Sequence, residues 1–309
     1  MIYEEFENLN NDRTVNAVIG INKEKFDKLA IAFEKASINL QEERLKNGEI
    51  KRIQSGGNKG FLDTFRKQLF FILFYLKTYT TFDVLGFHFG FSGGNAHTHV
   101  KQLLPVLERS LAILNVLPSR PPESLEDFMQ LIEKLDDIVI DCTECACVRP
   151  QDEEQQKAKY SGKKKRHTVK SLIASDLNKK ILIISFIVAG SMHDYALMKE
   201  LFDPKIKWFN KLIVWLDLGF FGANKDYNCS GIYLPHKKPK KSKNNKDIKL
   251  TSAQIKENKL HAKTRVIIEN AIGGMKVFYC LTDRIRNHLD ILIDSFFMIS
   301  AGLWNLKIS

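Results

Sequence analysis

The chain contains 309 residues, of which 44% are hydrophobic and 27% are charged, which excludes both a disulfide-stapled miniprotein and a chain that is disordered throughout. Its five cysteines, an odd number in a chain of this length, favour a reducing compartment over a secreted disulfide scaffold. Lys and Arg outnumber Asp and Glu by 47 to 36, and the net charge of +11 favours a polyanionic partner, most often nucleic acid.

The first 60 residues contain one predicted helix, at 23–36, and a Gly-rich stretch, SGGNKG, at 55–60. Glycines next to small polar residues break regular elements, so we interpret this stretch as a linker. We therefore expect an N-terminal helical and linker region over 1–60.

Residues 61–117 predict three helices, at 61–79, 81–89 and 94–114, with the sequence GFSGG between the second and the third. Ser92 stands where the third helix needs an N-cap, because its hydroxyl can accept a hydrogen bond from the first turn. A short helix, a tight turn with glycine and a longer helix describe a helix-turn-helix. We expect this all-α segment to be a DNA-binding domain.

The helix-turn-helix interpretation has a plain structural alternative. Helical hairpins with Gly turns are common, and the charges of residues 82–110 sum to zero. If the segment binds DNA, exposed residues near the start of the third helix would offer donors to base edges or phosphates. These candidates are Asn95, His97, His99 and Lys101.

Prolines at 118, 121 and 122 mark a domain boundary, and the pattern after it changes to strands and helices. Strands are predicted at 138–148, 167–175, 181–189, 212–217 and 232–235, and helices at 124–134, 193–202, 263–275 and 290–306. Only DLNKK separates the second and third strands, so the first three fit an antiparallel meander. The order predicts an α/β fold with a ribonuclease H-like mixed sheet over 118–309 and a Lys-rich insertion at about 220–262.

Two apolar runs were considered as membrane segments. The run at 69–76 is too short to span a bilayer, and the run at 291–306 is interrupted by Asp294 and Asn305. The start of the chain lacks the basic, apolar and small-residue order of a signal peptide. We expect no membrane association.

Three carboxylates lie in segments that such a sheet could bring together. Asp141 stands inside an apolar strand, where a charge is costly unless it is paired or binds a cation. Asp217 ends the strand LIVWLD, at the edge where α/β sheets place ligands, and Glu269 lies on a predicted helix. Three such carboxylates can hold two divalent cations. Among 36 acidic residues this spacing also arises by chance, so both interpretations stay open.

Two short segments, 161–170 and 237–249, carry net charges of five and six, which account for the whole positive excess. Such segments are either DNA contacts or solvated loops. The candidate DNA-binding residues are Lys163, Lys164, Lys165, Arg166 and Lys170 in the first segment and Lys237, Lys238, Lys240 and Lys241 in the second.

Two other motifs are weaker. Cys142, Cys145 and Cys147 form a C-x-x-C-x-C pattern, but on a strand Cys142 faces away from the other two, so buried thiols are favoured over zinc. His193 and Asp194 stand at a helix start, where Asp194 either complements the helix dipole or serves as an accessory site residue with His193.

Five ordered blocks resemble those of bacterial insertion-sequence transposases of the DDE type and the related Harbinger-like nucleases of eukaryotes. The blocks are DCTECACVRP at 141–150, YSGKKKRHTVK at 160–170, GSMHD at 190–194, WLDLGFFG at 215–222 and RVIIENAIGGMK at 265–276. The resemblance covers about residues 61–306 and implies a catalytic, metal-binding triad of Asp141, Asp217 and Glu269. It also places Arg265 and Lys276 at the flanking basic positions of the family.

One residue departs from the family pattern. Many relatives carry Tyr three residues before the Arg, where this chain has Ala262. A phosphate contact from that position is therefore in doubt, although the adjacent His261 could replace it.

The resemblance implies a DNA transposase that cleaves and transfers DNA strands by phosphoryl transfer with two Mg²⁺ ions per site, for which Mn²⁺ can substitute. Its partners would be double-stranded DNA, at terminal inverted repeats and target sites, and a second copy in a homodimer. We expect it in the cytoplasm or nucleoid if the source is a bacterium, and in the nucleus if it is a eukaryote. The alternatives are a catalytically silent, domesticated DNA-binding protein or repressor of the same fold, and a host nuclease.

Overall fold

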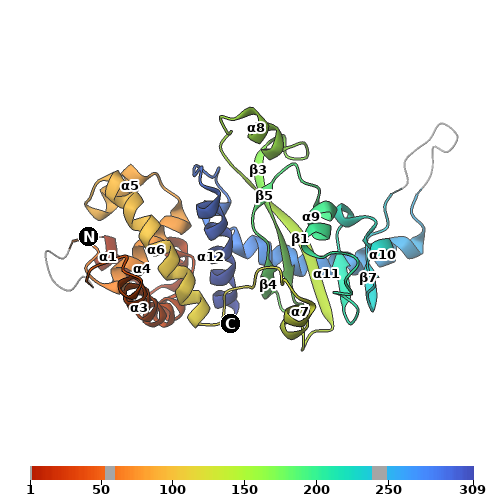
Figure 1. Ribbon diagram of the computed structural model, residues 1–309, viewed down its shortest axis with the longest axis horizontal. Helices are drawn as coiled ribbons and strands as arrows, with labels where there is room; N and C mark the ends of the chain where they lie inside the picture. The colour runs from red at the N-terminus through yellow and green to blue at the C-terminus, as the bar shows by residue number, and fades with distance from the viewer. Residues whose placement is uncertain (1, 53–59, 239–248) are drawn as a thin grey trace. The chain divides into compact units, whose positions relative to one another are not determined.

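Figure 1 shows the computed structural model, which describes residues 2–52, 60–238 and 249–309. Contacts divide the chain into two compact units, which are described separately here. The first unit comprises Met1–Leu117 and Met275–Ser309, and the second comprises Pro118–Gly274.

The first unit is built from helices. They are α1 (Ile2–Glu7), α2 (Asp12–Ile19), α3 (Lys23–Lys46), α4 (Phe65–Thr78), α5 (Phe82–Phe89), α6 (Gly93–Ile113), the 3-10 turn η2 (Tyr279–Leu281) and α12 (Asp290–Ile308). Helices α4, α5 and α6 are the three expected at 61–114. The helix predicted at 23–36 continues to Lys46, because no glycine or proline interrupts it before Gly48. Most of the predicted linker at 55–60 lies outside the described residues.

The turn between α5 and α6 depends on caps and on two glycines. The side chain of Ser92 accepts a hydrogen bond from the Asn95 N–H at 3.3 Å, which confirms the predicted N-cap. Gly90 ends α5 with a φ of +76°, in the left-handed region that favours glycine. A Cβ at Gly86 would lie 2.4 Å from the Phe91 carbonyl oxygen, so α5 can meet the turn only with glycine there.

Helix α12 completes the core of the first unit. A Cβ on Gly302 would lie 3.0 Å from Leu111 Cδ1, so glycine lets α12 approach α6 closely. The buried Asn305 amide donates to the Val116 carbonyl at 2.9 Å. Of the helices in the described residues, α12 is the one long and apolar enough to cross a membrane, but 61% of that window is buried, as in a core helix. Residues 275–309 thus pack with the N-terminal helices, whereas we expected them in the catalytic domain.

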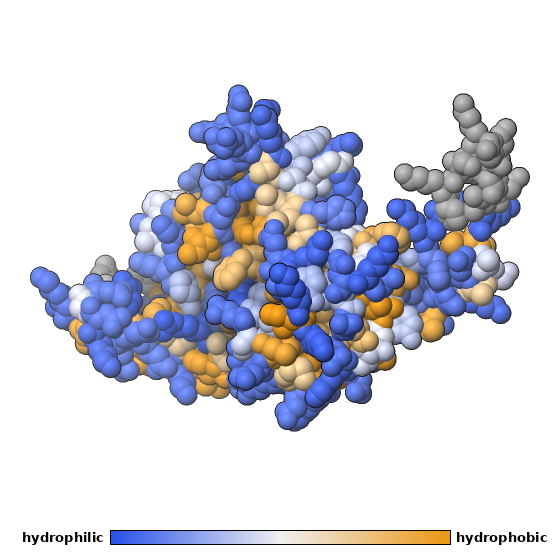
Figure 2. Space-filling view, turned by 45° about the vertical axis from the view of Figure 1, so that its right-hand side comes forward, coloured by the Kyte–Doolittle hydropathy of each residue, from blue (hydrophilic) through white to orange (hydrophobic). Residues whose placement is uncertain are grey.

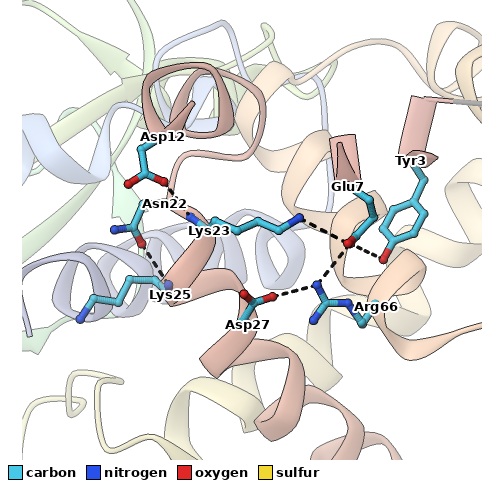
Figure 3. Close-up of polar contacts among 8 residues, drawn as sticks. All are labelled: Tyr3, Glu7, Asp12, Asn22, Lys23, Lys25, Asp27 and Arg66. Carbon is cyan, nitrogen blue, oxygen red and sulfur yellow. Dashed lines mark hydrogen bonds and ion pairs between the residues drawn. The ribbon is translucent and has the colours of Figure 1, made fainter. Parts of the chain in front are cut away.

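A polar cluster fastens α1 to the helices that follow it (Figure 3). Arg66 donates to Glu7 at 3.2 Å and to Asp27 at 2.8 Å, and Lys23 lies 3.4 Å from Glu7. The Tyr3 hydroxyl donates to Glu7, and burial together with this bond raises the pKa of Tyr3 to about 12. Because these charges are partly exposed, they orient α1 more than they stabilise the fold.

The second unit is a mixed sheet with helices. Its elements are α7 (Leu125–Leu131), β1 (Asp137–Ala146), α8 (Glu153–Lys159), β2 (Tyr160–Ser161), β3 (Arg166–Ser175), β4 (Ile181–Ile184), β5 (Val188–Ala189), α9 (Asp194–Leu201), β6 (Ile213–Leu216), the 3-10 turn η1 (Leu218–Phe220), α10 (Ala223–Asp226), β7 (Gly231–Tyr233) and α11 (Ser252–Met275). The strand order is β2-β3-β1-β6-β7, with β4 and β5 also paired to β3. β3 is antiparallel to β1 and β4, whereas β1, β6 and β7 are parallel. This is the predicted ribonuclease H-like order.

The predicted strand at 181–189 is interrupted at Ser185. Its hydroxyl accepts a hydrogen bond from the Leu172 N–H at 2.9 Å and thereby replaces a main-chain acceptor of the ladder. The two short strands β4 and β5 result, each paired with a different part of β3.

The core of the second unit fixes the positions of β1, which contains Asp141, and of β6, which ends just before Asp217. Its aromatic cluster consists of Phe128, Phe202, Trp208 and Phe209. Ile140 and Leu216, the residues immediately before the two aspartates, are buried in the same core. Tight packing leaves these strands one arrangement, and so it fixes both carboxylates.

Figure 2 shows one face of the molecule by residue hydropathy. On the face shown in Figure 2, hydrophilic residues cover most of the area and hydrophobic ones form small separate patches. Such scattered apolar residues are normal on a folded protein.

Candidate active site and DNA-binding residues

Asp141 and Asp217 come from neighbouring parallel strands. Ile140 pairs with Leu216, so the two aspartates that follow them stand next to each other in the register. β6 ends at Leu216, and Asp217 is the N-cap of η1, where its carboxylate accepts a hydrogen bond from the Leu218 N–H at 2.6 Å. The Asp141 carboxylate accepts from the Cys142 N–H at 2.8 Å. The sheet alone therefore brings two of the three predicted carboxylates together.

Helix α11 supplies the third carboxylate, and one guanidinium reaches all three. Arg265 lies 3.6 Å from Asp141, 3.2 Å from Asp217 and 3.0 Å from Glu269. Arg265 and Glu269 are one helical turn apart, so they share a face of α11. Residues separated by up to 128 positions in the sequence thus form one site.

The Asp141 side chain is only 17% exposed, and its electrostatics are unusual. Burial raises its pKa to about 6, against the lowering effects of the Cys142 N–H and the Arg265 charge; the charges of Asp217 and Asp194 raise it further. Burial disfavours the charged carboxylate because water no longer solvates it. A further cation beside Asp141 would favour the charged form, as the guanidinium already does in part.

The donor chemistry of this site suits a hard divalent cation. Its oxygens come from three carboxylates within reach of one positive group, and Mg²⁺ and Mn²⁺ prefer oxygen ligands. Across 2–52, 60–238 and 249–309, however, no three His, Cys, Asp or Glu side chains are arranged to hold a metal ion. The carboxylates face Arg265, so binding a cation among them requires Arg265 to move.

A second polar cluster lies in the same unit, and it corrects one prediction. Lys170 was expected to contact DNA, but its side chain is 5% exposed and its ammonium lies 2.6 Å from Asp194 and 3.4 Å from Glu144. Burial acts to lower the pKa of Lys170, but the bond to Asp194 and the charge of Glu144 outweigh it and the pKa is raised. Lys170 is therefore a buried ion-pair partner and not a DNA contact. Glu144 could not be identified from local sequence patterns, because strand register sets its partner.

The predicted accessory pair borders this cluster. Asp194 begins α9, and its charge contributes to the raised pKa of Asp141. A Cβ on Gly219 would lie 2.6 Å from the Asp194 carboxylate, so this glycine lets Asp194 approach the segment after Asp217. His193 is exposed at the N-cap position and makes no capping hydrogen bond through its side chain. Both residues line a cavity of about 250 Å³ together with Lys163.

The first basic segment forms the exposed connection between β2 and β3. Lys163, Lys164, Lys165 and Arg166 are all exposed there, and Lys165 has a φ of +54°. His167 is half-buried against the Tyr160 ring. Apart from Lys170, the cations of this segment are available to a polyanion.

The second basic segment is described only at its ends. Lys237 and Lys238 are exposed, and the Lys237 ammonium lies 5.4 Å from the centre of the Phe221 ring. Lys240 and Lys241 lie outside the described residues. Lys276 follows the last residue of α11 and belongs to the first unit.

On α6, the four predicted contacts differ in exposure. Asn95, His97 and Lys101 are exposed, whereas His99 is half-buried against Phe91, and this burial lowers the pKa of His99. His99 therefore supports the packing of the turn more than it offers a charge to DNA.

Burial also bears on the predictions for His261 and the cysteines. His261 was considered as a replacement phosphate contact, but it is 6% exposed and its ring nitrogen lies 3.1 Å from the Tyr233 carbonyl oxygen. It is therefore not accessible to DNA in this structure. The five cysteines all have free thiols, and Cys145 and Cys147 are buried while Cys142 is half-buried.

Comparisons with known proteins bear on the same residues. Residues 140–305 match the family described as DDE superfamily endonuclease, and residues 61–113 match the helix-turn-helix of DDE superfamily endonuclease. A relative from Microchaete diplosiphon, described as a probable transposase for insertion sequence element IS702, is 24% identical over 289 residues, which cover 92% of this chain and 95% of that protein. No solved structure matches the chain. The two matched ranges contain the three carboxylates and α4–α6, respectively.

Proposed function

Because the chain belongs to the DDE superfamily of endonucleases and carries its helix-turn-helix, we propose that it is a transposase whose catalytic residues are Asp141, Asp217 and Glu269. One observation carries this assignment: the guanidinium of Arg265 lies within 3.6 Å of all three carboxylates, which come from three separate segments. Like charges gather in this way where a site binds cations.

The proposed cofactor is Mg²⁺, two ions per site, with Mn²⁺ as a substitute. Bound between the carboxylates, divalent cations would help to activate water or a DNA 3′-hydroxyl and to neutralise the leaving oxygen. Asp141 and Asp217 are placed to hold them from the sheet, and Glu269 from α11.

Arg265 has a proposed second position in the catalytic cycle. Its planar guanidinium can donate two parallel hydrogen bonds to a phosphate as readily as to a carboxylate. When cations take over the carboxylates, Arg265 would turn to the phosphate beside the scissile bond. Lys276, seven residues after Glu269, is a proposed second phosphate contact.

Asp194 and His193 are proposed to position this site. Asp194 fixes the ammonium of Lys170 and acts on the pKa of Asp141, so it influences the triad without belonging to it. The cations of the two basic segments are proposed contacts to DNA phosphates. They are the exposed residues Lys163, Lys164, Lys165, Arg166, Lys237 and Lys238, together with Lys240 and Lys241.

Recognition of the element ends is assigned to α6. Its exposed residues Asn95, His97 and Lys101 suit base edges and phosphates in a major groove, with Asn95 able to bond an adenine. The DNA is proposed to be the terminal inverted repeats, and a homodimer would hold the two ends.

The experiment that tests this function is cleavage of a duplex carrying the element end and its flank. Wild-type protein should cut this duplex in Mg²⁺ or Mn²⁺ but not in a buffer that contains EDTA and no divalent cation. With a metal ion present, it should also join the freed 3′ end to target DNA. Cutting that persists in EDTA would contradict the metal assignment, and cutting without preference for the end would contradict the recognition assignment.

A catalytically silent DNA-binding protein is the competing function, and one observation favours it. Arg265 already lies within 3.6 Å of all three carboxylates and offsets part of their charge, as it would in a site that no longer takes up cations. Titration calorimetry with Mn²⁺ separates the two, because a silent protein would bind the end duplex but no Mn²⁺ at this site. Loss of Mn²⁺ binding in Asp217→Asn would support the enzyme.

A further inference from the structure

The segment between η2 and α12 lies against the start of the helix-turn-helix, although the two are about 200 residues apart. The Arg286 guanidinium donates to the carbonyls of Tyr79 at 2.5 Å and Thr80 at 3.0 Å, and the main-chain N–H of Arg286 donates to the Tyr79 hydroxyl at 3.0 Å. The same guanidinium lies 4.2 Å from the centre of the Tyr79 ring. Ile285 beside it is fully buried. The segment is thus fixed to the α4–α5 connection.

This contact creates a cavity of about 460 Å³ within the first unit. One wall is the start of α5, from Thr81 to Asp83, together with His97 of α6, and the other is formed by Arg286, Asn287 and His288. His97 is one of the exposed residues near the start of α6. A duplex contacted by this part of α6 would therefore also pass residues 286–288.

The charges on the two walls differ. The charged residues of 82–110 sum to zero, and the Arg109 guanidinium of α6 is paired with Glu43. The carboxylate of Asp83 lies against Gly93, at the first turn of α6, where the positive end of the helix dipole stabilises it. The helix-turn-helix by itself thus offers few cations to phosphates.

The segment after η2 supplies what α5 and α6 lack. Arg284, Arg286 and His288 are exposed. The hydrogen bonds of Arg286 go to uncharged oxygens, and within the described residues neither Arg284 nor Arg286 is paired with a carboxylate. Arg286 therefore keeps its charge beside the start of α6, and with the exposed Asp283 counted, the segment at 282–289 has a net charge of +1.

We propose that residues 284–288 form a second DNA-binding element, which holds the sugar-phosphate backbone of the duplex whose bases α6 contacts. Arg284 and His288 bind phosphate oxygens directly, and Arg286 contributes charge while it fixes the segment to the α4–α5 connection. This inference rests on the proposed DNA binding by α6 and adds to it a contact that carries no sequence information.

The test is the salt dependence of binding by the full-length protein, measured by fluorescence anisotropy on an end duplex and on a scrambled duplex of equal length. Arg284→Gln should weaken binding to both duplexes alike, by about three- to tenfold, and reduce the slope of log affinity against log salt by about one. Arg284→Gln/Arg286→Gln should reduce the slope further than Arg284→Gln alone, because it removes a second charge from the segment. Thermal unfolding of each variant shows whether the unit is still folded.

Two control variants separate this inference from the proposed function. Lys35→Gln removes one charge from the exposed face of α3, away from the cavity, and should leave the slope unchanged. Asn95→Ala should weaken binding to the end duplex alone. If wild type prefers the end duplex but Arg284→Gln keeps its affinity and slope, the inference is wrong and the function stands. If wild type shows no preference, end recognition fails, and the scrambled duplex still measures the phosphate contact.

Discussion

Asp141 and Asp217 stand side by side because Ile140 and Leu216 pair across parallel strands, and both carboxylates reach the guanidinium of Arg265. The pairing residues are buried in the core, so the two carboxylates cannot separate without unfolding of the sheet. The Arg265 guanidinium between them offsets part of their mutual repulsion. The predictions below follow from this relationship and from the buried cluster beside it.

Asp217→Asn should reduce DNA cleavage by roughly a thousandfold or more, because a charge that neutralises developing negative charge is worth several kcal/mol. The Asp217 side chain is 30% exposed, so the amide should be accommodated without unfolding. Single-turnover cleavage of an end duplex measures the effect. Glu200→Gln, an exposed acid on α9, is the matched control and should keep wild-type activity. Equal activity of the two variants would remove Asp217 from the site.

Arg265→Ala should destabilise the metal-free protein, since three carboxylates would then face one another without a counter-charge. The same variant should bind Mn²⁺ more tightly, because the competing cation is gone. Thermal unfolding with and without Mn²⁺ measures both effects, and the gain on adding Mn²⁺ should be larger than in wild type. An Mn²⁺ affinity equal to that of wild type would show that the guanidinium does not compete for the carboxylates.

The pKa of Asp141 predicts how stability depends on pH. In the folded state it is raised from 3.8 to about 6, so the native state keeps this proton to a higher pH than the unfolded chain. The contribution of Asp141 to the free energy of unfolding is therefore fully present below about pH 4. It decreases by at most about 3 kcal/mol as the pH rises through about 6. Asp141→Asn should remove this loss and be more stable at pH 7 in metal-free buffer.

Urea unfolding between pH 4 and pH 7 provides the measurement for Asp141. The difference in unfolding free energy between wild type and Asp141→Asn should grow with pH across this window. A difference that stays constant would mean that the Asp141 carboxyl titrates at its ordinary pKa.

Lys170→Met should lower the free energy of unfolding by about 3–5 kcal/mol, because Asp194 and Glu144 would keep buried charges without their partner. Lys164→Met, at the exposed connection between β2 and β3, should change it by less than about 0.5 kcal/mol. DNA binding should show the opposite pattern. Only Lys164→Met should reduce the slope of log affinity against log salt. A flattened slope in a folded Lys170→Met protein would restore Lys170 as a DNA contact.

Local sequence signals determined the elements of both units to a large extent. Ser92 marks the start of α6 because hydroxyl caps act within one turn, and the helices at 65–113 follow from apolar periodicity and the glycines at their turn. The five expected strands are present, apart from the interruption at Ser185. The short helices α1, α2 and α8 were not predicted, because elements of this length carry little periodic signal.

Contacts between residues far apart in the chain could not be predicted from local sequence patterns. Lys170 looked like any other cation of its segment, but the register of β1 with β3 pairs Lys170 with Glu144 and makes it a buried partner. The tail at 290–308 packs with the helices of the first unit, although the endonuclease family match at 140–305 includes most of it. Its packing against α6 depends on shape, through Gly302 and Leu111, and no periodicity encodes that choice.

The sequence by itself determined the α/β class, the helix-turn-helix and the identity of the three candidate carboxylates, since these depend on patterns within about 10 to 20 residues and on ordered family blocks. The tertiary structure alone decided which cations face outward, that Arg265 reaches all three carboxylates, and that residues 286–288 line a cavity with His97 of α6. The physical reason is that burial and charge pairing are set by contacts between segments distant in the chain, and such contacts exist only once the core has packed.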